Sequence, residues 1–189
     1  LCLPRLRQTN LGNEQALVRW VKAADGAMAL DYPVLDRYLY LALGHCGKPP
    51  SVCLYIWDRF CGEQYLGTAN VKAASAGYLY SLFDPGTGQV AEAAGPNWDS
   101  PEIVDFLRQL VEGVRARLAQ RGLEGAMMLG LSGDQRPSQA AADVIRQAVP
   151  GAKWVSQAHP PLFDLCVIPA GYVTTVWNAG APADPQMQR

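Results

Sequence analysis

The stretch Ala126–Pro137, AMMLGLSGDQRP, determines how the rest of the chain is interpreted. Its first six residues are apolar or small and predict a short, fully buried strand. Two glycines then permit a tight turn that carries Asp134 and Gln135, and a helical pattern opens at Pro137. Ligands bind at the carboxyl ends of strands in parallel sheets, so this polar pair is the first candidate site. The alternative is that Asp134 is only a turn residue that bonds backbone N–H groups.

Strands and helices alternate along the chain. Buried strands are predicted near residues 51–57, 125–131, 153–158 and 172–177. Helices are predicted from an Asp31 N-cap to Gly47, from Ser100 to Gly122 and from about Ser138 to Val149. The second helix has the clearest apolar face, made of Ile103, Leu107, Leu110, Val114 and Leu118. Alternating strands and helices favour a parallel sheet, because parallel strands need crossover connections.

The predicted fold class is α/β, a partial (β/α)8 TIM-barrel-like parallel sheet with outer helices. Polar strand ends, without a G-x-G-x-x-G or Walker loop, favour a barrel over a nucleotide-binding sheet. A complete barrel takes about 250 residues, whereas this chain has 189. We therefore expect an incomplete barrel over residues 1–178 and a Pro- and Ala-rich tail over residues 179–189. The long excursion from Phe60 to Trp98 is expected to cover a site.

Composition narrows the classes of partner and cofactor. The net charge of −1 gives no electrostatic reason to expect nucleic acid or an anionic membrane. No apolar run approaches the roughly 18 residues that span a bilayer. The five cysteines lack C-x-x-C spacing and the chain has two histidines, so neither a metal site nor another cofactor is predicted. Cys46, Cys53 and Cys166 are expected to be small buried hydrophobic residues.

Three segments together resemble the catalytic barrel of glycoside hydrolase family 123. They are VRWVKAADGAMALDYPVLDRYLYLALGHCGKPPSVCLYIW, LAQRGLEGAMMLGLSGD and PGAKWVSQAHP, and the resemblance covers roughly residues 10–178. It implies a β-N-acetylgalactosaminidase-like barrel that acts on carbohydrate, outside the cell or in the periplasm. It also implies flanking β-sandwich domains, or missing barrel strands, in a longer protein.

The resemblance further implies substrate-assisted catalysis. The 2-acetamido oxygen of the sugar attacks the anomeric carbon, an Asp steadies the acetamido N–H, and the next residue, a Glu, protonates the leaving oxygen. Here this catalytic pair corresponds to Asp134 and Gln135. Gln135 cannot act as the acid, because an amide has no acidic proton near neutral pH.

Three alternatives follow from Gln135. The proton comes from another loop residue, for which Asp58, Glu63 and His159 are the candidates. Otherwise, the domain is a non-catalytic carbohydrate-binding barrel or a structural module of a larger protein. The third alternative is that Asp134 is merely a strand-end residue and the pair is wrongly aligned.

Four residues near predicted strand ends are candidates for substrate binding: Trp57, Asp58, His159 and Trp177. Tryptophan at these ends offers a flat surface on which an apolar sugar face can stack, and packing in the core is the alternative. For Tyr55, core packing is the favoured interpretation. His159 either bonds a sugar hydroxyl or satisfies a backbone carbonyl.

Overall fold

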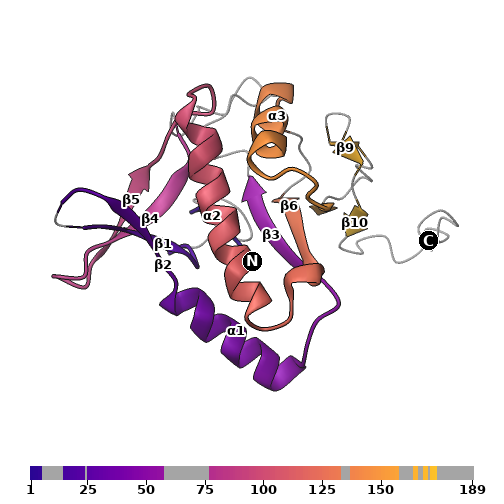
Figure 1. Cartoon of the computed structure of the whole chain (residues 1–189), viewed down its shortest axis with the longest axis horizontal. Coiled ribbons are helices and arrows are strands. Elements are labelled where there is room, and N and C mark those ends of the chain that lie inside the picture. The colour runs from indigo at the N-terminus through magenta and orange to yellow at the C-terminus, as the bar shows by residue number, and fades with distance from the viewer. Residues whose placement is uncertain are drawn as a thin grey trace, which may run out of the picture.

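A computed structural model of the chain describes residues 1–5, 15–23, 25–57, 77–132, 137–157, 164–165, 168–169 and 171–173. These residues form two four-stranded sheets, a two-stranded hairpin, three α-helices and one short 3-10 helix (Figure 1). The tail predicted at residues 179–189 lies outside the described residues. No helix in the described part of the chain is long and apolar enough to cross a membrane.

The first sheet is parallel throughout and has the strand order β10-β7-β6-β3. Its strands are β3 (Val52–Trp57), β6 (Met127–Ser132), β7 (Trp154–Gln157) and β10 (Gly171–Val173). Leu54 lies opposite Leu129, and both side chains are fully buried. The predicted α/β class and the parallel pairing of these strands are therefore confirmed.

The N-terminal residues continue this sheet beside β3. The Tyr55 N–H donates to the Leu1 carbonyl over 2.7 Å, and the Leu3 N–H donates to the Tyr55 carbonyl over 2.9 Å. Cys2 forms an isolated parallel bridge with Tyr55. Along the sheet, these residues, β3, β6, β7 and β10 thus follow one another in chain order, without the reversal that defines a doubly wound sheet. The described strands form an open sheet, and no closed barrel is seen among them.

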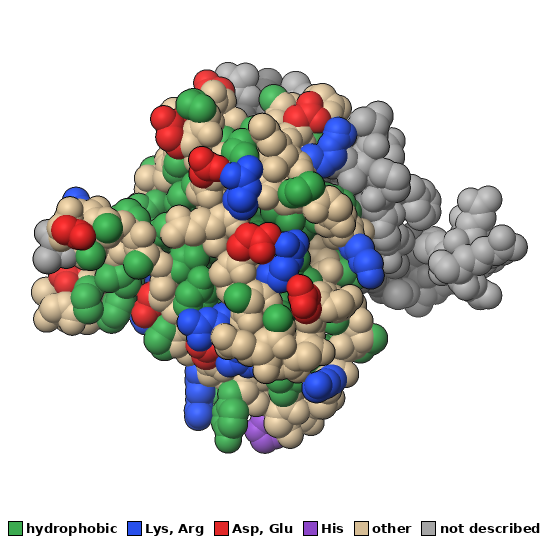
Figure 2. Space-filling view, in the orientation of Figure 1, with side chains coloured by type: hydrophobic (Ala, Val, Ile, Leu, Met, Phe, Trp, Pro, Cys, Tyr) green, Lys and Arg blue, Asp and Glu red, His purple; other side chains and the backbone are tan. Residues whose placement is uncertain are grey.

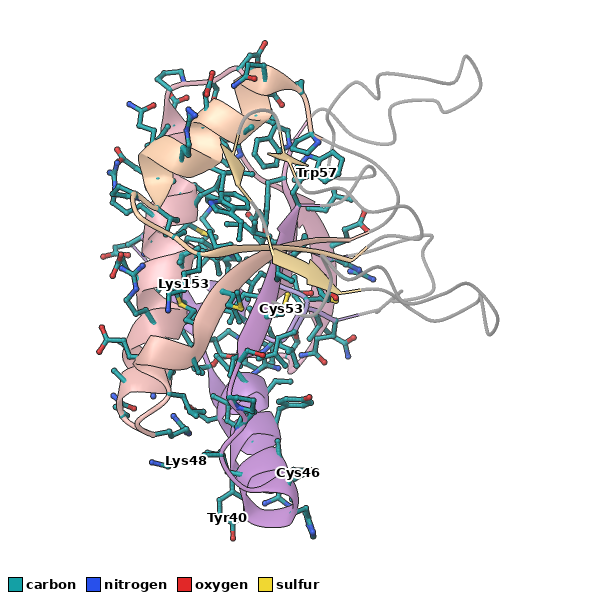
Figure 3. All side chains as sticks on the ribbon, turned by 90° about the vertical axis from the view of Figure 1, so that its right-hand side faces the viewer. Tyr40, Cys46, Lys48, Cys53, Trp57 and Lys153 are labelled. Atoms are coloured by element: carbon teal, nitrogen blue, oxygen red, sulfur yellow. The ribbon has the colours of Figure 1, made fainter. Side chains whose placement is uncertain are left out.

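Two helices cover one face of the parallel sheet (Figure 3). They are α2 (Glu102–Ala119) and α3 (Gln139–Ala148), and a 3-10 helix, η1 (Glu124–Ala126), leads from α2 into β6. The predicted apolar face of α2 is buried in full, at Ile103, Leu107, Leu110, Val114 and Leu118. The Ser138 side chain caps α3 by accepting the Ala141 N–H. These apolar helix faces and the strands they cover form the core.

The second sheet is mixed and has the order β2-β1-β4-β5. Its strands are β1 (Arg19–Lys22), β2 (Met28–Asp31), β4 (Leu79–Phe83) and β5 (Val90–Ala94). Trp20 of β1 stacks on Phe106 of α2, with ring centroids 4.6 Å apart. The Arg5 N–H donates to the Leu79 carbonyl, so the N-terminal segment contacts both sheets. A further antiparallel pair, β8 (Asp164–Leu165) and β9 (Ile168–Pro169), was not predicted, and neither were β2 and β5.

Helix α1 (Pro33–Cys46) docks on the C-terminal half of α2. The carboxylate of Asp36 accepts hydrogen bonds from Arg117, over 3.2 Å, and from Arg121, over 2.7 Å. The Arg117 guanidinium also lies 4.3 Å from the centroid of the Tyr32 ring. Gly113 permits this approach, because a Cβ there would overlap the Tyr32 hydroxyl oxygen. The glycine inside α2 is therefore explained by the close packing of Tyr32 against this helix.

Two expectations for α1 are wrong. Asp31 is not the N-cap, since the cap is Tyr32 and Asp31 ends β2, where it accepts a hydrogen bond from Arg19. Pro33 at the first helical position begins the helix, because its fixed φ suits the first turn. Cys46 is exposed, not buried, because it lies in the last turn just before Gly47, whose φ of 71° ends the helix.

Substitution of Gly113 by alanine is expected to destabilise the protein by about 1–3 kcal/mol, through overlap with the Tyr32 hydroxyl. That cost outweighs the gain of about 1 kcal/mol that alanine normally brings inside a helix. The free energy of unfolding, measured in urea, checks this. Adding Tyr32→Phe to Gly113→Ala removes the overlapping oxygen and should restore much of the loss.

Gly44→Ala is the matched control for this prediction. Gly44 lies in α1, and a Cβ there meets nothing within 4 Å. The substitution is therefore expected to stabilise by about 0.5–1 kcal/mol. If Gly113→Ala were as stabilising as Gly44→Ala, the close packing of Tyr32 against α2 would be refuted.

Candidate active site

The carboxyl ends of the four parallel strands form one edge of the first sheet. Trp57 of β3 lies opposite Leu131 of β6, and Ser132 of β6 lies opposite Gln157 of β7. Gln157 also lies opposite Val173 of β10. In parallel α/β proteins this edge carries the ligand site.

Most of the predicted site residues follow the described strands in the sequence. Asp58 directly follows β3, Asp134 and His159 come two residues after β6 and β7, and Trp177 comes four residues after β10. The predicted residues outside the described part of the chain are Asp58, Glu63, Asp134, Gln135, His159 and Trp177. Their juxtaposition therefore stays a prediction, and the described structure ends at the strands that precede them in the sequence.

Trp57 is the one predicted site residue that the structure describes, and a β-bulge determines its position. The pairing of β3 with β6 shifts register between Tyr55 and Trp57, so that Trp57 lies opposite Leu131. Strict alternation would place Trp57 on the same face as Tyr55. Instead, the burial alternation along β3 breaks, and Ile56 and Trp57 are both buried, with Trp57 1% exposed. The ring belongs to the hydrophobic core, which favours core packing over sugar stacking.

Tyr55 and Cys53 occupy the other face of β3 and are only partly buried. Both lie against Gly130 of β6, where a Cβ would overlap the Cys53 sulfur and come 3.0 Å from Tyr55 Cδ1. Position 130 of the predicted strand therefore has to be glycine for Cys53 and Tyr55 to pack against β6 on this face. Tyr55 packs against the sheet, in agreement with the interpretation favoured from the sequence.

Both ionisable groups on this face are held in their neutral forms. Burial raises the pKa of the Cys53 thiol and also raises the pKa of the Tyr55 hydroxyl. A thiol with a raised pKa is a poor nucleophile, because the thiolate is the reactive species. Neither of these two groups carries a charge at neutral pH.

Two polar residues at this edge, Ser132 and Gln157, were not among the predicted site residues. Both end strands whose preceding residues are mostly apolar, and the register places them opposite each other. A polar residue at the last position of a buried strand was the available signal. The predicted site residues Asp134 and His159 instead follow these strands in the sequence, and no role was predicted for Ser132 or Gln157.

Among the described residues, no group of three or more His, Cys, Asp and Glu side chains could hold a metal ion. Figure 2 shows basic and acidic side chains interspersed over the face that α2 occupies. Several of them are paired along α2, such as Asp105 with Arg108 and Glu112 with Arg115.

Comparison with known families assigns the class of this α/β domain. The family model described as glycoside hydrolase 123, catalytic domain, matches residues 4–163. Because the match spans most of the chain, the protein belongs to this family, as its sequence resemblance predicted. No curated protein matches the chain.

A solved structure shows the same fold. It is a family 123 glycoside hydrolase from Clostridium perfringens, whose structural analysis concerned the hydrolysis of glycolipid glycans. The two structures superpose with a TM-score of 0.56 at 12% sequence identity. The match covers 86% of this chain but 27% of the clostridial chain, so this chain spans about a quarter of that enzyme's length. At this identity the comparison establishes the fold alone.

Removal of the Trp57 ring is expected to lower the stability of the domain. Trp57→Ala should lower the free energy of unfolding by about 3–5 kcal/mol, as expected for a fully buried aromatic residue. Tyr40→Ala is the control, because Tyr40 is 67% exposed and its loss should change stability by less than about 0.5 kcal/mol. Thermal denaturation of both variants measures this. A Trp57→Ala variant of unchanged stability would show that the ring is not part of the core.

Proposed function

We propose that this domain acts on glycosides of 2-acetamido sugars by substrate-assisted catalysis, at a rate limited by Gln135. The observation that carries the proposal is membership of the glycoside hydrolase 123 catalytic family over residues 4–163. The sequence position of Asp134 supports it, because Asp134 follows Ser132, the last residue of β6, by two residues. Parallel strands in chain order also support a partial (β/α)8 barrel, because such barrels are built from successive neighbouring strands.

In the proposed reaction, the acetamido oxygen forms a bond to the anomeric carbon as the glycosidic C–O bond breaks. The Asp134 carboxylate accepts a hydrogen bond from the acetamido N–H and so orients the attacking oxygen. Water then opens the cyclic intermediate and restores the acetamido group. No metal ion or cofactor enters this scheme, and the substrate itself is the nucleophile.

The leaving oxygen must acquire a proton, and this proton transfer is the difficult step of the proposed reaction. Residue 135 would be the proton donor if it were a glutamate, but the amide of Gln135 cannot give up a proton. Loss of a general acid costs about 10²- to 10⁴-fold in rate. Natural glycans have poor leaving groups and need the proton, whereas aryl glycosides need it much less.

Gln135 also favours a second function, sugar binding without turnover. A domain that keeps Asp134 but has no acid would still hold the acetamido group. Aryl glycosides distinguish the two functions, because a slow enzyme cleaves them and a sugar-binding protein does not.

The test compares two substrate classes across variants. The wild-type protein should cleave a nitrophenyl N-acetylgalactosaminide slowly and natural-type glycans hardly at all. Gln135→Glu should raise kcat on natural-type glycans by about 10²-fold or more and change aryl cleavage little. Asp134→Ala should abolish both activities, because nothing then orients the acetamido group.

Gln89→Glu is the matched control, since it makes the same chemical change in the exposed turn between β4 and β5. It should leave both activities as in the wild type. If Gln135→Glu and Gln89→Glu behaved alike on both substrate classes, the general-acid position would not be residue 135. Binding of the sugar without cleavage of any substrate would support the non-catalytic function.

A further inference from the structure

Helix α1 carries most of the large hydrophobic side chains that the described residues expose. Four such side chains are exposed among those residues, and three of them belong to α1. The three are Tyr38, Tyr40 and Leu41, which lie within a single turn of the helix. Single exposed hydrophobic residues are ordinary, whereas a group on one helix face indicates a contact surface.

This outer face of α1 has little charge. Asp36, the one carboxylate of the helix, is held inward by hydrogen bonds from Arg117 and Arg121. Arg37 is the one Lys or Arg of the helix, and its guanidinium carbon lies 5.7 Å from the centroid of the Tyr40 ring. The face is therefore apolar, with a single permanent positive charge beside it.

Gly44 leaves a gap on the same face. It follows Leu41 by three residues, so the two positions are neighbours on the helix surface. Gly44 is exposed, and a Cβ there would meet nothing within 4 Å. No contact within the described part of the domain therefore requires this glycine, although glycine weakens a helix relative to alanine. A second surface that approaches α1 closely would make use of the gap.

The outer face is complementary to itself when two α1 helices lie antiparallel. A two-fold axis beside Leu41 sets residues that are equally far before and after it opposite each other in the two copies. Leu41 then meets Leu41 of the second copy, and Tyr38 meets Gly44 of the second copy. The exposed ring of one copy thus fills the gap of the other. We infer that α1 is a docking surface for a second copy of this chain, with Leu41 on the two-fold axis.

Charge selects the antiparallel arrangement. In it, each Arg37 lies opposite His45 of the other copy, so the two Arg37 positions are about 12 Å apart along the helices. That separation exceeds the Debye length of about 8 Å at physiological ionic strength. A parallel pair would instead place the two guanidinium groups side by side. A face with one permanent cation also offers an anionic membrane little electrostatic attraction.

The docking surface lies away from the carboxyl edge of the parallel sheet. Helix α1 leads into the first residue of β3, and Figure 1 shows it at the end of the molecule opposite the tip of that strand. In Figure 3, Tyr40 points away from the sheet. Docking of a second copy therefore leaves the carboxyl edge open, and the inference does not depend on the proposed function. A helix of 14 residues is about 21 Å long, so the interface is small and the dimer transient.

Sedimentation velocity measures the association directly. The wild-type chain should show a reversible monomer–dimer equilibrium between about 10 μM and 1 mM, as small interfaces do. Leu41→Glu and Leu41→Lys should each weaken dimerisation by about 10-fold or more, because like charges then meet on the axis. An equimolar mixture of these two variants should associate again, since position 41 faces itself. Met28→Glu is the matched control, because Met28 is 38% exposed, close to the 40% of Leu41, but lies outside α1.

A second variant separates docking from folding. Gly44→Gln fills the gap and should raise the dimer Kd by about 5- to 100-fold, because the Tyr38 ring of the other copy loses its space. Glutamine favours a helix more than glycine does, so the Tm of this variant should rise. Weaker dimerisation together with a higher Tm cannot come from damage to the fold.

Four outcomes would overturn the inference. The first is a wild-type chain that stays monomeric throughout this range. The second is a dimer that Leu41→Glu and Gly44→Gln leave intact, because another surface then holds it. The third is a mixture of the Leu41→Glu and Leu41→Lys variants that stays monomeric, because position 41 then does not face itself. The fourth is a monomeric wild type whose α1 binds vesicles of phosphatidylcholine and phosphatidylserine and loses them in Leu41→Glu, because the face then docks on a membrane.

Discussion

The pairing of β3 with β6 is the interaction on which the rest of the domain depends. On one face, Leu54 and Leu129 lie opposite each other and are fully buried with the helices that cover them. On the other, Gly130 lets Cys53 and Tyr55 close onto β6. The two strands are far apart in the chain, so their contact requires the intervening excursion and α2 to form a crossover. The N-terminal segment adds to the free edge of β3, and β7 and β10 add to that of β6.

Much of this framework could be predicted from local sequence patterns. The buried face of α2, the C-terminal glycine of α1 and the Ser138 cap of α3 are signals that lie within a few residues of their effect. The parallel sheet followed from the alternation of apolar strands with helices, because only crossover connections join such elements in parallel. The position of Asp134 just after β6 followed from the same pattern.

The parts that could not be predicted depend on contacts between distant residues. Alternation along β3 assigns Trp57 to the face of Tyr55, and only the register against β6 reveals the bulge that moves Trp57 into the core. Asp31 resembles an N-cap in sequence, but a better partner, Arg19, lies opposite it on β1. Likewise, the backbone positions of Ser132, Gln157 and Val173 lie opposite one another only because three strands from different parts of the chain share a register. Periodicity within one segment carries no information about such alignments.

The fold and the chemistry of this domain are carried by different parts of the sequence. Apolar contacts such as that of Leu54 with Leu129 hold the strands in place, and they act whatever residues follow β6. Glutamine has nearly the shape of glutamate but no proton to give near neutral pH. Under the proposed mechanism, an exchange of one for the other at position 135 changes the barrier to glycosidic cleavage much more than the free energy of folding. Under that mechanism, a chain that keeps the apolar contacts of the family 123 fold also keeps its fold when glutamine stands at the position that would protonate the leaving oxygen.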